Sequence, residues 1–295
     1  MQASSCKTET TILSEPEWLE RRRAHEERVL TWIGPHQARS ARGEKHPVYD
    51  FLFEYYRFRP AWLRRWHPGP DVLLQGAAAS GFLRWPEYHE TDEGVGLNVA
   101  ALPRRESVAW MLNLLRVTAE RPPQFACYGL HEWAMVYRRT PAEVRHPAWP
   151  LRFPPDELAR IVEAQPVRCS HFDAFRFFTV PARPLNRLQP TRPEVPQFEQ
   201  RGCLHANMDL YKWAFKLAPF TPSELVADCF ALARDIREVD MRASPYDFAP
   251  LGFAPIRIET PEGRTEYEAH QRAFAERSQP LRARLIALAE RLLAS

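Results

Sequence analysis

The sequence predicts a mainly α protein with a small β element (α+β), folded as a compact single helical domain. Apolar residues recur at spacings of three and four along several stretches of the 295-residue chain, which is the periodicity of amphipathic helices. Strand-like alternation with aromatic enrichment occurs in only two short segments. We therefore expect residues 14–295 to form one globular domain, preceded by a flexible N-terminus over residues 1–13.

Two capping signals mark the starts of helices. Ser14 fits the N-cap of a first helix and Glu17 its capping-box partner, three residues later. Thr221 and Glu224 occupy the same two positions at the start of a second helix, with a proline between them. Periodicity predicts further helices over roughly 48–57, 106–120, 155–164, 204–218 and 264–293.

The β element is expected in residues 167–180 and 254–267, the second of which continues into a glycine-containing turn. Side chains of a strand alternate between its two faces, so the first segment would place four residues on one face. These are Cys169, His171, Asp173 and Phe175. Five prolines interrupt the following stretch, which predicts a surface loop or a boundary near 181–200.

Composition narrows the class of protein. Hydrophobic residues make up 45% of the chain and charged residues 26%, as in soluble globular proteins. No run of 18 apolar residues occurs, and the N-terminus lacks the pattern of a signal peptide, so we expect a cytoplasmic protein without a membrane partner. The net charge of +3 is too small to predict nucleic-acid binding, and the oligomeric state stays open.

The cysteines and glycines argue against two further classes, disulfide-stabilised domains and enzymes with a glycine-rich nucleotide loop. Five scattered cysteines, an odd number, do not suit a disulfide framework, so we expect reduced thiols that pack as small buried hydrophobes. They are Cys6, Cys127, Cys169, Cys203 and Cys229. The eleven glycines form neither GxGxxG nor GxxxxGK[ST], which disfavours the common nucleotide-dependent transfers.

Three short segments each combine a thiol, an imidazole and a carboxylate, the groups used for proton transfer and metal binding. They are "CYGLHEW" (Cys127, His131, Glu132), "CSHFD" (Cys169, His171, Asp173) and "CLHANMD" (Cys203, His205, Asp209). Their spacings match no standard zinc motif. One hypothesis is a metal-dependent enzyme in which His131, His171 and His205 converge, with a nearby carboxylate, on one divalent ion that activates water or oxygen.

Each of these residues also has a structural interpretation. On a helix over 204–218, a polar stripe of His205, Asp209, Lys212 and Lys216 either faces solvent or faces a site. His131 with Glu132, and His171 with Asp173, fit buried core pairs equally well. Asp240, where the second capped helix meets a loop, is a carboxylate that could face a cleft.

The segment "YYRFRPAWLRRWHPG", residues 55–69, interleaves arginines with aromatic residues and contains no acid. Guanidinium groups suit phosphates and aromatic rings suit unstacked bases, so the composition fits a nucleic-acid surface. The DNA-binding candidates are Arg57, Arg59, Arg64, Arg65 and Trp66. The alternative is a helix hairpin with core aromatic residues and solvated arginines.

Taken together, five segments resemble a bacterial family named in genomes as 3-methyladenine DNA glycosylases. They are "GEKHPVYDFLFEYYRFRPAWLRRWHPG", "YGLHEWAMVYR", "RCSHFDAFRFF", "CLHANMDLYKWAFKLAPF" and "DMRASPYDF", and the resemblance spans roughly residues 14–285. It implies a monofunctional enzyme without a cofactor, which binds DNA and hydrolyses the N-glycosidic bond of an alkylated purine. The damaged base would be flipped into an aromatic pocket, where a carboxylate stabilises the transition state.

No glycosylase motif of this family transfers residue by residue, because the helix-hairpin-helix glycine loop and its catalytic Asp are missing. Candidates therefore follow from chemistry. For the reaction they are Asp209, Asp173, Glu132 and Asp240, together with His205 and His171; for base stacking they are Trp66, Trp133, Tyr211 and Trp213. A non-catalytic nucleic-acid-binding protein is the third hypothesis, since the same arginine-rich segment would serve it.

Overall fold

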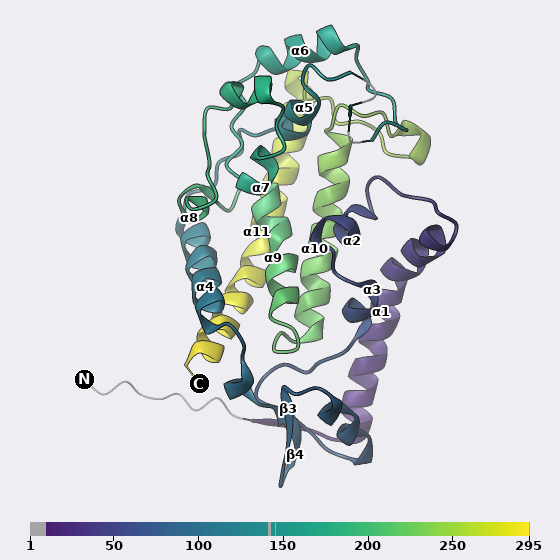
Figure 1. The fold of residues 1–295 in the computed structure, drawn as a ribbon, viewed down its shortest axis with the longest axis vertical. Helices are drawn as coiled ribbons and strands as arrows, with labels where there is room; N and C mark the ends of the chain where they lie inside the picture. Colours follow the sequence, from purple (N-terminus) through teal and green to yellow (C-terminus); the bar gives the residue numbers. More distant parts are fainter. Residues whose placement is uncertain (1–9, 141–142, 145, 295) are drawn as a thin grey trace, which may run out of the picture.

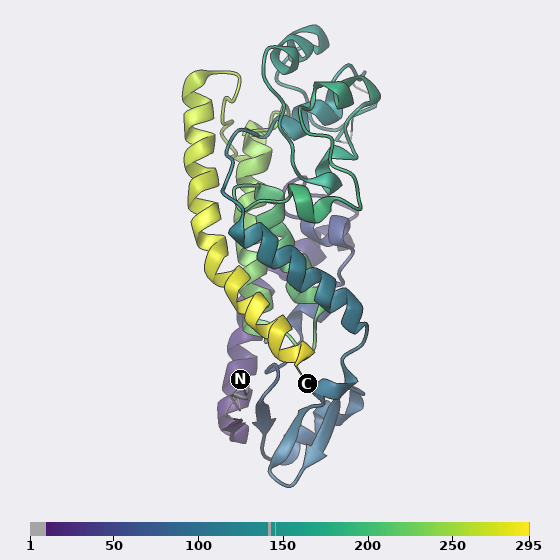
Figure 2. The ribbon, with the colours of Figure 1, turned by 90° about the vertical axis from the view of Figure 1, so that its left-hand side faces the viewer.

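Four long helices form the centre of the molecule in the computed structural model, which describes residues 10–140, 143–144 and 146–294. They are α4 (Arg105–Glu120), α9 (Leu204–Lys216), α10 (Ser223–Arg242) and α11 (Pro261–Leu293). Helix α9 packs against α10 and α11, and α4 crosses α11 (Figures 1 and 2). The mainly α class with a small β element is confirmed.

The first helix, α1 (Glu15–Ala41), begins where its capping signal predicts. The Glu17 carboxylate accepts hydrogen bonds from the Ser14 amide at 2.8 Å and the Ser14 hydroxyl at 2.6 Å. Helix α1 runs along the side of the bundle, next to α3 (Pro60–Arg64) and α10. Local sequence therefore determines this helix start.

The second capping signal predicts a helix at the right place but with the wrong cap. Helix α10 begins at Ser223, so Pro222 occupies the N-cap position and Thr221 lies outside the helix. The Ser223 hydroxyl accepts from the His67 amide at 2.8 Å and donates to the Arg65 carbonyl at 3.1 Å. A tertiary contact thus replaces the predicted local one.

The other predicted helices are confirmed within a few residues, as α2 (Phe51–Tyr56), α4, α6 (Pro155–Glu163), α9 and α11. Short helices that the periodicity did not predict lie below the predicted α6 in the upper half of the molecule in Figure 1. They are α5 (Leu130–Val136), α7 (Phe172–Phe175), η3 (Val180–Leu185) and α8 (Val195–Phe198). Residues 181–200 are thus a proline-rich connection that contains two short helical turns.

The sheet lies at the opposite end, and neither predicted strand belongs to it. Its strand order is β1-β2-β4-β3, with β1 parallel to β2 and the other pairs antiparallel. The strands are β1 (Thr11–Leu13), β2 (Val72–Leu74), β3 (Tyr88–Thr91) and β4 (Gly94–Leu97). The short helix η1 (Ala77–Arg84) connects β2 to β3, and η2 (Val99–Ala101) leads from β4 to α4. Residues 1–9 of the predicted flexible N-terminus lie outside the described residues, while Thr11–Leu13 is an ordered strand.

Both strand predictions are wrong for local reasons. In 167–180 the His171 carbonyl accepts from the amides of Ala174 and Phe175, which starts α7 and removes the expected alternation of faces. In 254–267 the chain is irregular until α11 begins at Pro261, after the short helix η4 (Ala249–Leu251). There the Thr260 hydroxyl accepts from the Gly263 amide at 3.1 Å and caps the helix.

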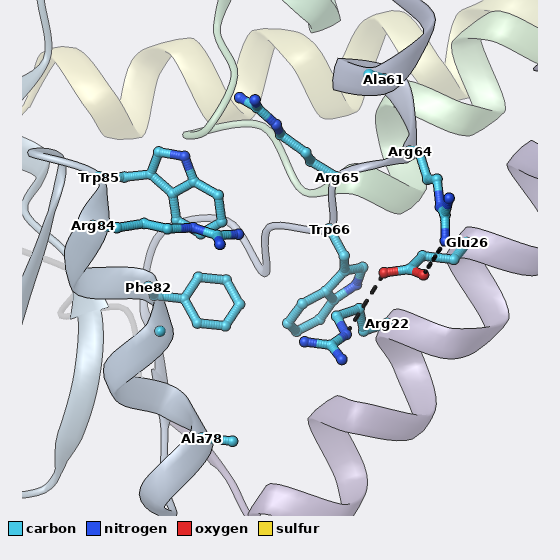
Figure 3. A pocket seen from close by; sticks show the side chains of 11 residues that line it. Arg22, Glu26, Ala61, Arg64, Arg65, Trp66, Ala78, Phe82, Arg84 and Trp85 are labelled. Atoms are coloured by element: carbon cyan, nitrogen blue, oxygen red, sulfur yellow. Dashed lines mark hydrogen bonds and ion pairs between the residues drawn. The ribbon is translucent and has the colours of Figure 1, made fainter.

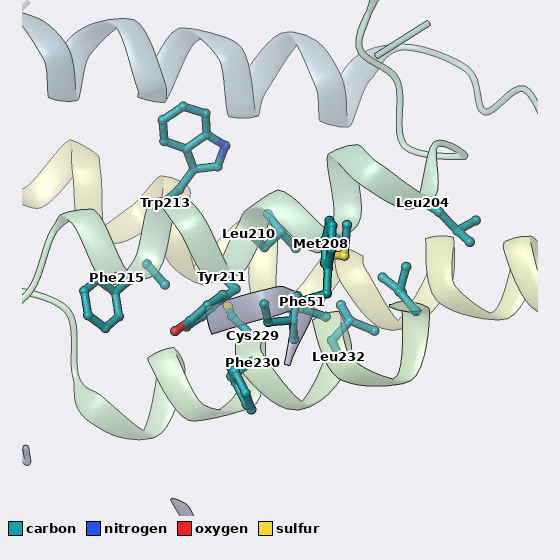
Figure 4. Close-up of a cluster of buried hydrophobic side chains, with 14 of the residues drawn as sticks. Phe51, Leu204, Met208, Leu210, Tyr211, Trp213, Phe215, Cys229, Phe230 and Leu232 are labelled. Carbon is teal, nitrogen blue, oxygen red and sulfur yellow. The ribbon is translucent and has the colours of Figure 1, made fainter. Parts of the chain in front are cut away.

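Helix α9 is buried on nearly every side, which determines the environment of the candidate site. Its apolar stripe packs on Phe230 and Leu232 of α10 and near Phe51 of α2 (Figure 4). The first half of its polar stripe is buried as well, because His205 packs on His131 of α5 and Asp209 lies next to His171, which precedes α7. Lys216, at the end of the stripe, is exposed. Within the part of the chain that the structure describes, no helix is long and apolar enough to cross a bilayer.

Candidate metal centre and adjoining pocket

Three histidines from distant segments meet in the interior. His131 lies on α5, His171 directly precedes α7, and His205 lies in the first turn of α9. The ring of His205 is 4.5 Å from that of His131 and 5.2 Å from that of His171, measured between centroids. The predicted convergence of three imidazoles is therefore present in the fold.

Their ligand atoms fall into two groups rather than around one point. The inner group is His131, His205 and Asp240, whose ligand atoms all lie within 4.8 Å of one another. The closest pair within it is His131 Nε2 and Asp240 Oδ1, 3.0 Å apart. Asp240 belongs to the last turn of α10 and is 1% exposed, so it does not face a cleft as expected.

The outer group is His171, Glu199 and Asp209, again with ligand atoms within 4.8 Å of one another. His171 Nε2 lies 3.4 Å from Glu199 Oε1 and 3.5 Å from Asp209 Oδ2. Glu199 was not a sequence candidate, because it stands alone in the proline-rich connection without a neighbouring imidazole or thiol. One ion bound by all three histidines does not fit this arrangement, since His171 belongs to the other group.

Charge is distributed unequally among the inner residues. Burial opposes a charge on His131, but the Asp240 carboxylate outweighs it and raises the pKa of this imidazole above its usual range. Burial and the neighbouring His131 instead lower the pKa of His205 well below its usual range. Among the described residues, no hydrogen bond reaches a ring nitrogen of His205. His205 is thus a neutral imidazole with a nitrogen lone pair available for a ligand.

In the outer group, Asp209 is tightly held. Burial would raise the pKa of this carboxyl, but Lys212 and His171 hold it below its usual range. The Lys212 ammonium donates to Oδ2 at 2.6 Å and the Tyr56 hydroxyl to Oδ1 at 2.6 Å. Burial raises the pKa of Glu199, whose side chain lacks comparable donors.

The inner carboxylate and imidazole also have supporting contacts. Cys127 Sγ lies 3.4 Å from His131 Nδ1, and the Tyr267 hydroxyl lies 3.3 Å from Asp240 Oδ1. Arg237, 1% exposed, approaches Asp240 at 3.5 Å. Contacts of this kind orient metal ligands and set their basicity in known metal sites.

Glu132 is buried in an ion pair, as its structural interpretation expects, but its partner is Arg237 and not His131. Its carboxylate accepts from Arg237 at 2.9 Å, which makes a buried salt bridge between α5 and α10. It therefore contributes to packing and to the charge balance beside the inner group. Of the cysteines in the described residues, Cys169, Cys203 and Cys229 are buried and Cys127 is partly buried, while Cys6 lies outside the described residues.

The first two residues of the polar stripe of α9 do not face solvent, whereas Lys216 at the end of the helix is exposed. His205 and Asp209 are 7% and 2% exposed, so the solvated-face interpretation is wrong for both. Lys212 and Lys216 extend further along the same helix into a pocket of about 970 Å³. The stripe thus runs from the inner group, through Asp209 of the outer group, to the pocket.

This large pocket lies between α4, the end of α9 and the segment around α7. Glu199 and Asp173 line it, and Asp173 pairs with Arg176 at 3.1 Å and with Lys212 at 3.4 Å. Neither His131 nor Asp240 lines this pocket. The outer group therefore meets the pocket through Glu199, and the inner group lies behind it.

Of the four base-stacking candidates, only Trp213 reaches this pocket, where the Trp110 ring packs edge-on against it with centroids 5.8 Å apart. Trp133 and Tyr211 are fully buried, and the Trp133 indole donates to the Ala243 carbonyl at 2.8 Å. Trp66 is buried too, and its indole donates to a glutamate of α10. These three rings pack in the core, which leaves no face for a flipped base.

The arginine-rich segment matches its structural interpretation in part. Arg57, Arg59, Arg64 and Arg65 are exposed, whereas most aromatic residues between them pack inward. Figure 3 shows a second pocket, of about 280 Å³, where Arg64 pairs with Glu26 at 3.4 Å and Arg84 covers the Trp85 ring. None of the candidate catalytic carboxylates lines this pocket.

Comparison with known proteins finds no matching protein family, no matching curated protein and no matching solved structure. The fold and the two groups define a helical protein with a buried histidine and carboxylate centre beside an open pocket. The chemistry of this centre follows from its imidazole and carboxylate groups.

Proposed function

We propose that this protein is a metal-dependent enzyme whose ion is bound by the inner group, His131, His205 and Asp240. The observation that carries the proposal is the buried, neutral His205 imidazole, which faces a second imidazole and a carboxylate. The lone pair of a neutral imidazole that accepts no hydrogen bond from the protein is free to bind an ion.

The donor set supports the same proposal. Two imidazoles and one carboxylate are the protein ligands of many catalytic zinc sites and of non-haem iron oxygenases. When bound, such an ion supplies an open coordination position at which water or oxygen is activated. The chain itself contributes Cys127 and Tyr267, which orient His131 and Asp240, and a pocket for an organic substrate.

Metal analysis tests the proposal directly. We expect protein purified without chelator or affinity tag to contain zinc or iron by mass spectrometry, and His205→Ala to lose the equivalent bound by the inner group. His67→Ala is the matched control, because His67 is equally buried but lies beside Tyr88, outside the centre. A folded wild-type protein that neither contains nor takes up zinc or iron would refute the proposal.

We propose an alkylpurine DNA glycosylase as the second candidate, because of one feature of the surface. A small pocket lined by Trp62, Arg65 and Trp85 shares wall residues, among them Glu87, with the large pocket. An exposed cationic and aromatic surface thus continues to a pocket that contains carboxylates and Trp213. Such a path suits an extruded base.

The second candidate is tested by incubating the protein with methylated duplex DNA in EDTA and measuring free bases by mass spectrometry. Release of 3-methyladenine above a heat-depurination blank, abolished in Asp173→Asn or Asp209→Asn, would favour the glycosylase. Salt-dependent DNA binding without any released base would favour a non-catalytic nucleic-acid-binding protein. If the protein neither binds DNA nor releases a base, both the glycosylase and the non-catalytic nucleic-acid-binding protein are excluded.

A further inference from the structure

We infer that the outer group, His171, Glu199 and Asp209, binds a second divalent metal ion at the floor of the large pocket. The inference rests on the proposed function, because it extends the same centre from one ion to two. It also assigns different tasks to the two groups, since only the outer one reaches the pocket.

The spacing of the ligand atoms carries the inference. His171 Nε2 lies 3.4 and 3.5 Å from its two carboxylate oxygens, clearly longer than the roughly 2.7–2.9 Å of a charge-assisted hydrogen bond. Ligands about 2.0–2.2 Å from a tetrahedral ion are separated from one another by roughly 3.3–3.6 Å. The two distances from His171 therefore match the spacing of donors around an ion, and the ligand atoms of all three residues lie within 4.8 Å of one another.

Glu199 supplies a second, independent observation. The residue is 95% buried, yet apart from the His171 contact its side chain has no hydrogen bond or ion pair within the described ranges. Burying a carboxylate in this way is costly unless a cation compensates it. His171 Nδ1 is also buried and without a hydrogen-bond partner.

The surroundings of Asp209 match those of a metal-binding carboxylate. Tyr56 and Lys212 each donate to one of its oxygens, which fixes the orientation of the carboxylate while leaving further lone pairs. Lys212 is also the nearest cation that would oppose an ion, and it reaches toward Asp173 in the pocket wall. Lys212 thus tunes the affinity of the outer group.

The two ions would be neighbours, because the rings of His171 and His205 stack at 5.2 Å. The outer ion would face a substrate in the pocket, because Glu199 lines that pocket. The inner ion would lie deeper, because none of its three ligands lines the pocket. A mixed set of imidazole and carboxylate ligands suits zinc, iron or manganese. Centres with two metals commonly divide substrate binding from activation of a nucleophile in this way.

The experiment is metal titration of the full-length protein after chelator treatment. Zinc is added, excess is removed by gel filtration, and bound metal is measured by mass spectrometry. We expect two equivalents in the wild type, and one in Glu199→Gln and in His171→Ala, which alter only the outer group. We expect one in His205→Ala and none in the His171→Ala, His205→Ala double variant.

Asp50→Asn is the control for a buried carboxylate elsewhere, since Asp50 binds Arg39 and His36 beside α1. It should retain two equivalents. Anomalous diffraction at the zinc edge should add two peaks, one in each group. The isosteric Glu199→Gln keeps the test valid if His171→Ala fails to fold.

The two proposals fail in different ways. One equivalent that is lost in His205→Ala but unchanged in Glu199→Gln and His171→Ala would overturn the second ion and leave the inner site. No binding in the wild type would overturn both. Two equivalents that persist in every variant would show adventitious surface binding and would also overturn the inference.

Discussion

The ring of His205 stands edge-on against the ring of His131, with centroids 4.5 Å apart and planes at 81°. One of these imidazoles is paired with a carboxylate and the other is not, although both are buried. Their different partners give them opposite protonation at neutral pH. A divalent ion would replace the proton shared by His131 and Asp240 and use the lone pair of His205 as well.

Zinc should stabilise the folded protein through the inner group. At a free concentration of about 100 times its dissociation constant, a ligand that binds only the native state adds about 2.7 kcal/mol to the free energy of unfolding. We expect a gain of this size per ion in urea titrations of the wild-type protein. His131→Ala should lose the part that the inner group supplies, and an unchanged gain in this variant would contradict the assignment.

Lys212→Met should tighten metal binding by the outer group while weakening the metal-free fold. The change removes a cation 2.6 Å from an Asp209 oxygen, and the carboxylate is then buried with less compensation. We expect a lower midpoint of thermal unfolding without metal and a larger rise on adding zinc than in the wild type. Arg176→Met is the control, because Arg176 contacts only Asp173 among the carboxylates.

Glu132→Gln should strongly destabilise the protein, because it leaves Arg237 buried beside Phe51 with a weakened partner. Because Asp240 still lies 3.5 Å from Arg237, we expect a loss toward the lower end of the about 3–5 kcal/mol of a broken buried pair. Glu20→Gln, which removes the partner of Arg23 on the exposed side of α1, should cost about 1 kcal/mol or less. Urea unfolding compares the two, and equal losses would refute the structural role of Glu132.

His67 should make stability depend on pH. Burial lowers its pKa from 6.5 to about 4, so the unfolded chain binds a proton more readily than the folded one across this range. The free energy of unfolding should therefore fall as pH decreases from about 6.5 to about 4, with up to about 3 kcal/mol from this residue.

The measurement is urea unfolding at several pH values for the wild type and His67→Asn. The asparagine can still bond to the Tyr88 hydroxyl, which lies 3.0 Å from His67 Nδ1, but it does not titrate. Its stability curve should be flatter between pH 6.5 and 4. Identical slopes for the two proteins would mean that His67 is not the group responsible.

Most of the helical framework could be predicted from the sequence, because its signals are local. Ser14 and Glu17 lie three residues apart and bond to each other, so their pattern predicts the start of α1 correctly. Thr221 is not the N-cap of α10 as predicted. The helix start instead contacts a distant segment, because Ser223 accepts a hydrogen bond from His67, 156 residues away in the chain. The strands failed for the same reason, since β1 and β2 are three residues each and pair across some 60 positions.

The residues of the candidate site also divide into those that local sequence identified and those that it did not. His131, His171 and His205 were named from sequence because each stands beside a thiol and a carboxylate. Glu199 was missed, because it has no such neighbours and its role depends on where the proline-rich connection places it. Trp133 and Tyr211 have the right chemistry for stacking, but packing buries both.

The sequence alone determined where the long helices run and which side chains could act as metal donors, since both depend on residues a few positions apart. Only the tertiary structure decided that the three imidazoles belong to two groups, because those distances join segments tens of residues apart. Packing on every side of α9 also removed water from His205 and Asp209. Burial of that kind sets the protonation of a side chain, and no local pattern of residues specifies it.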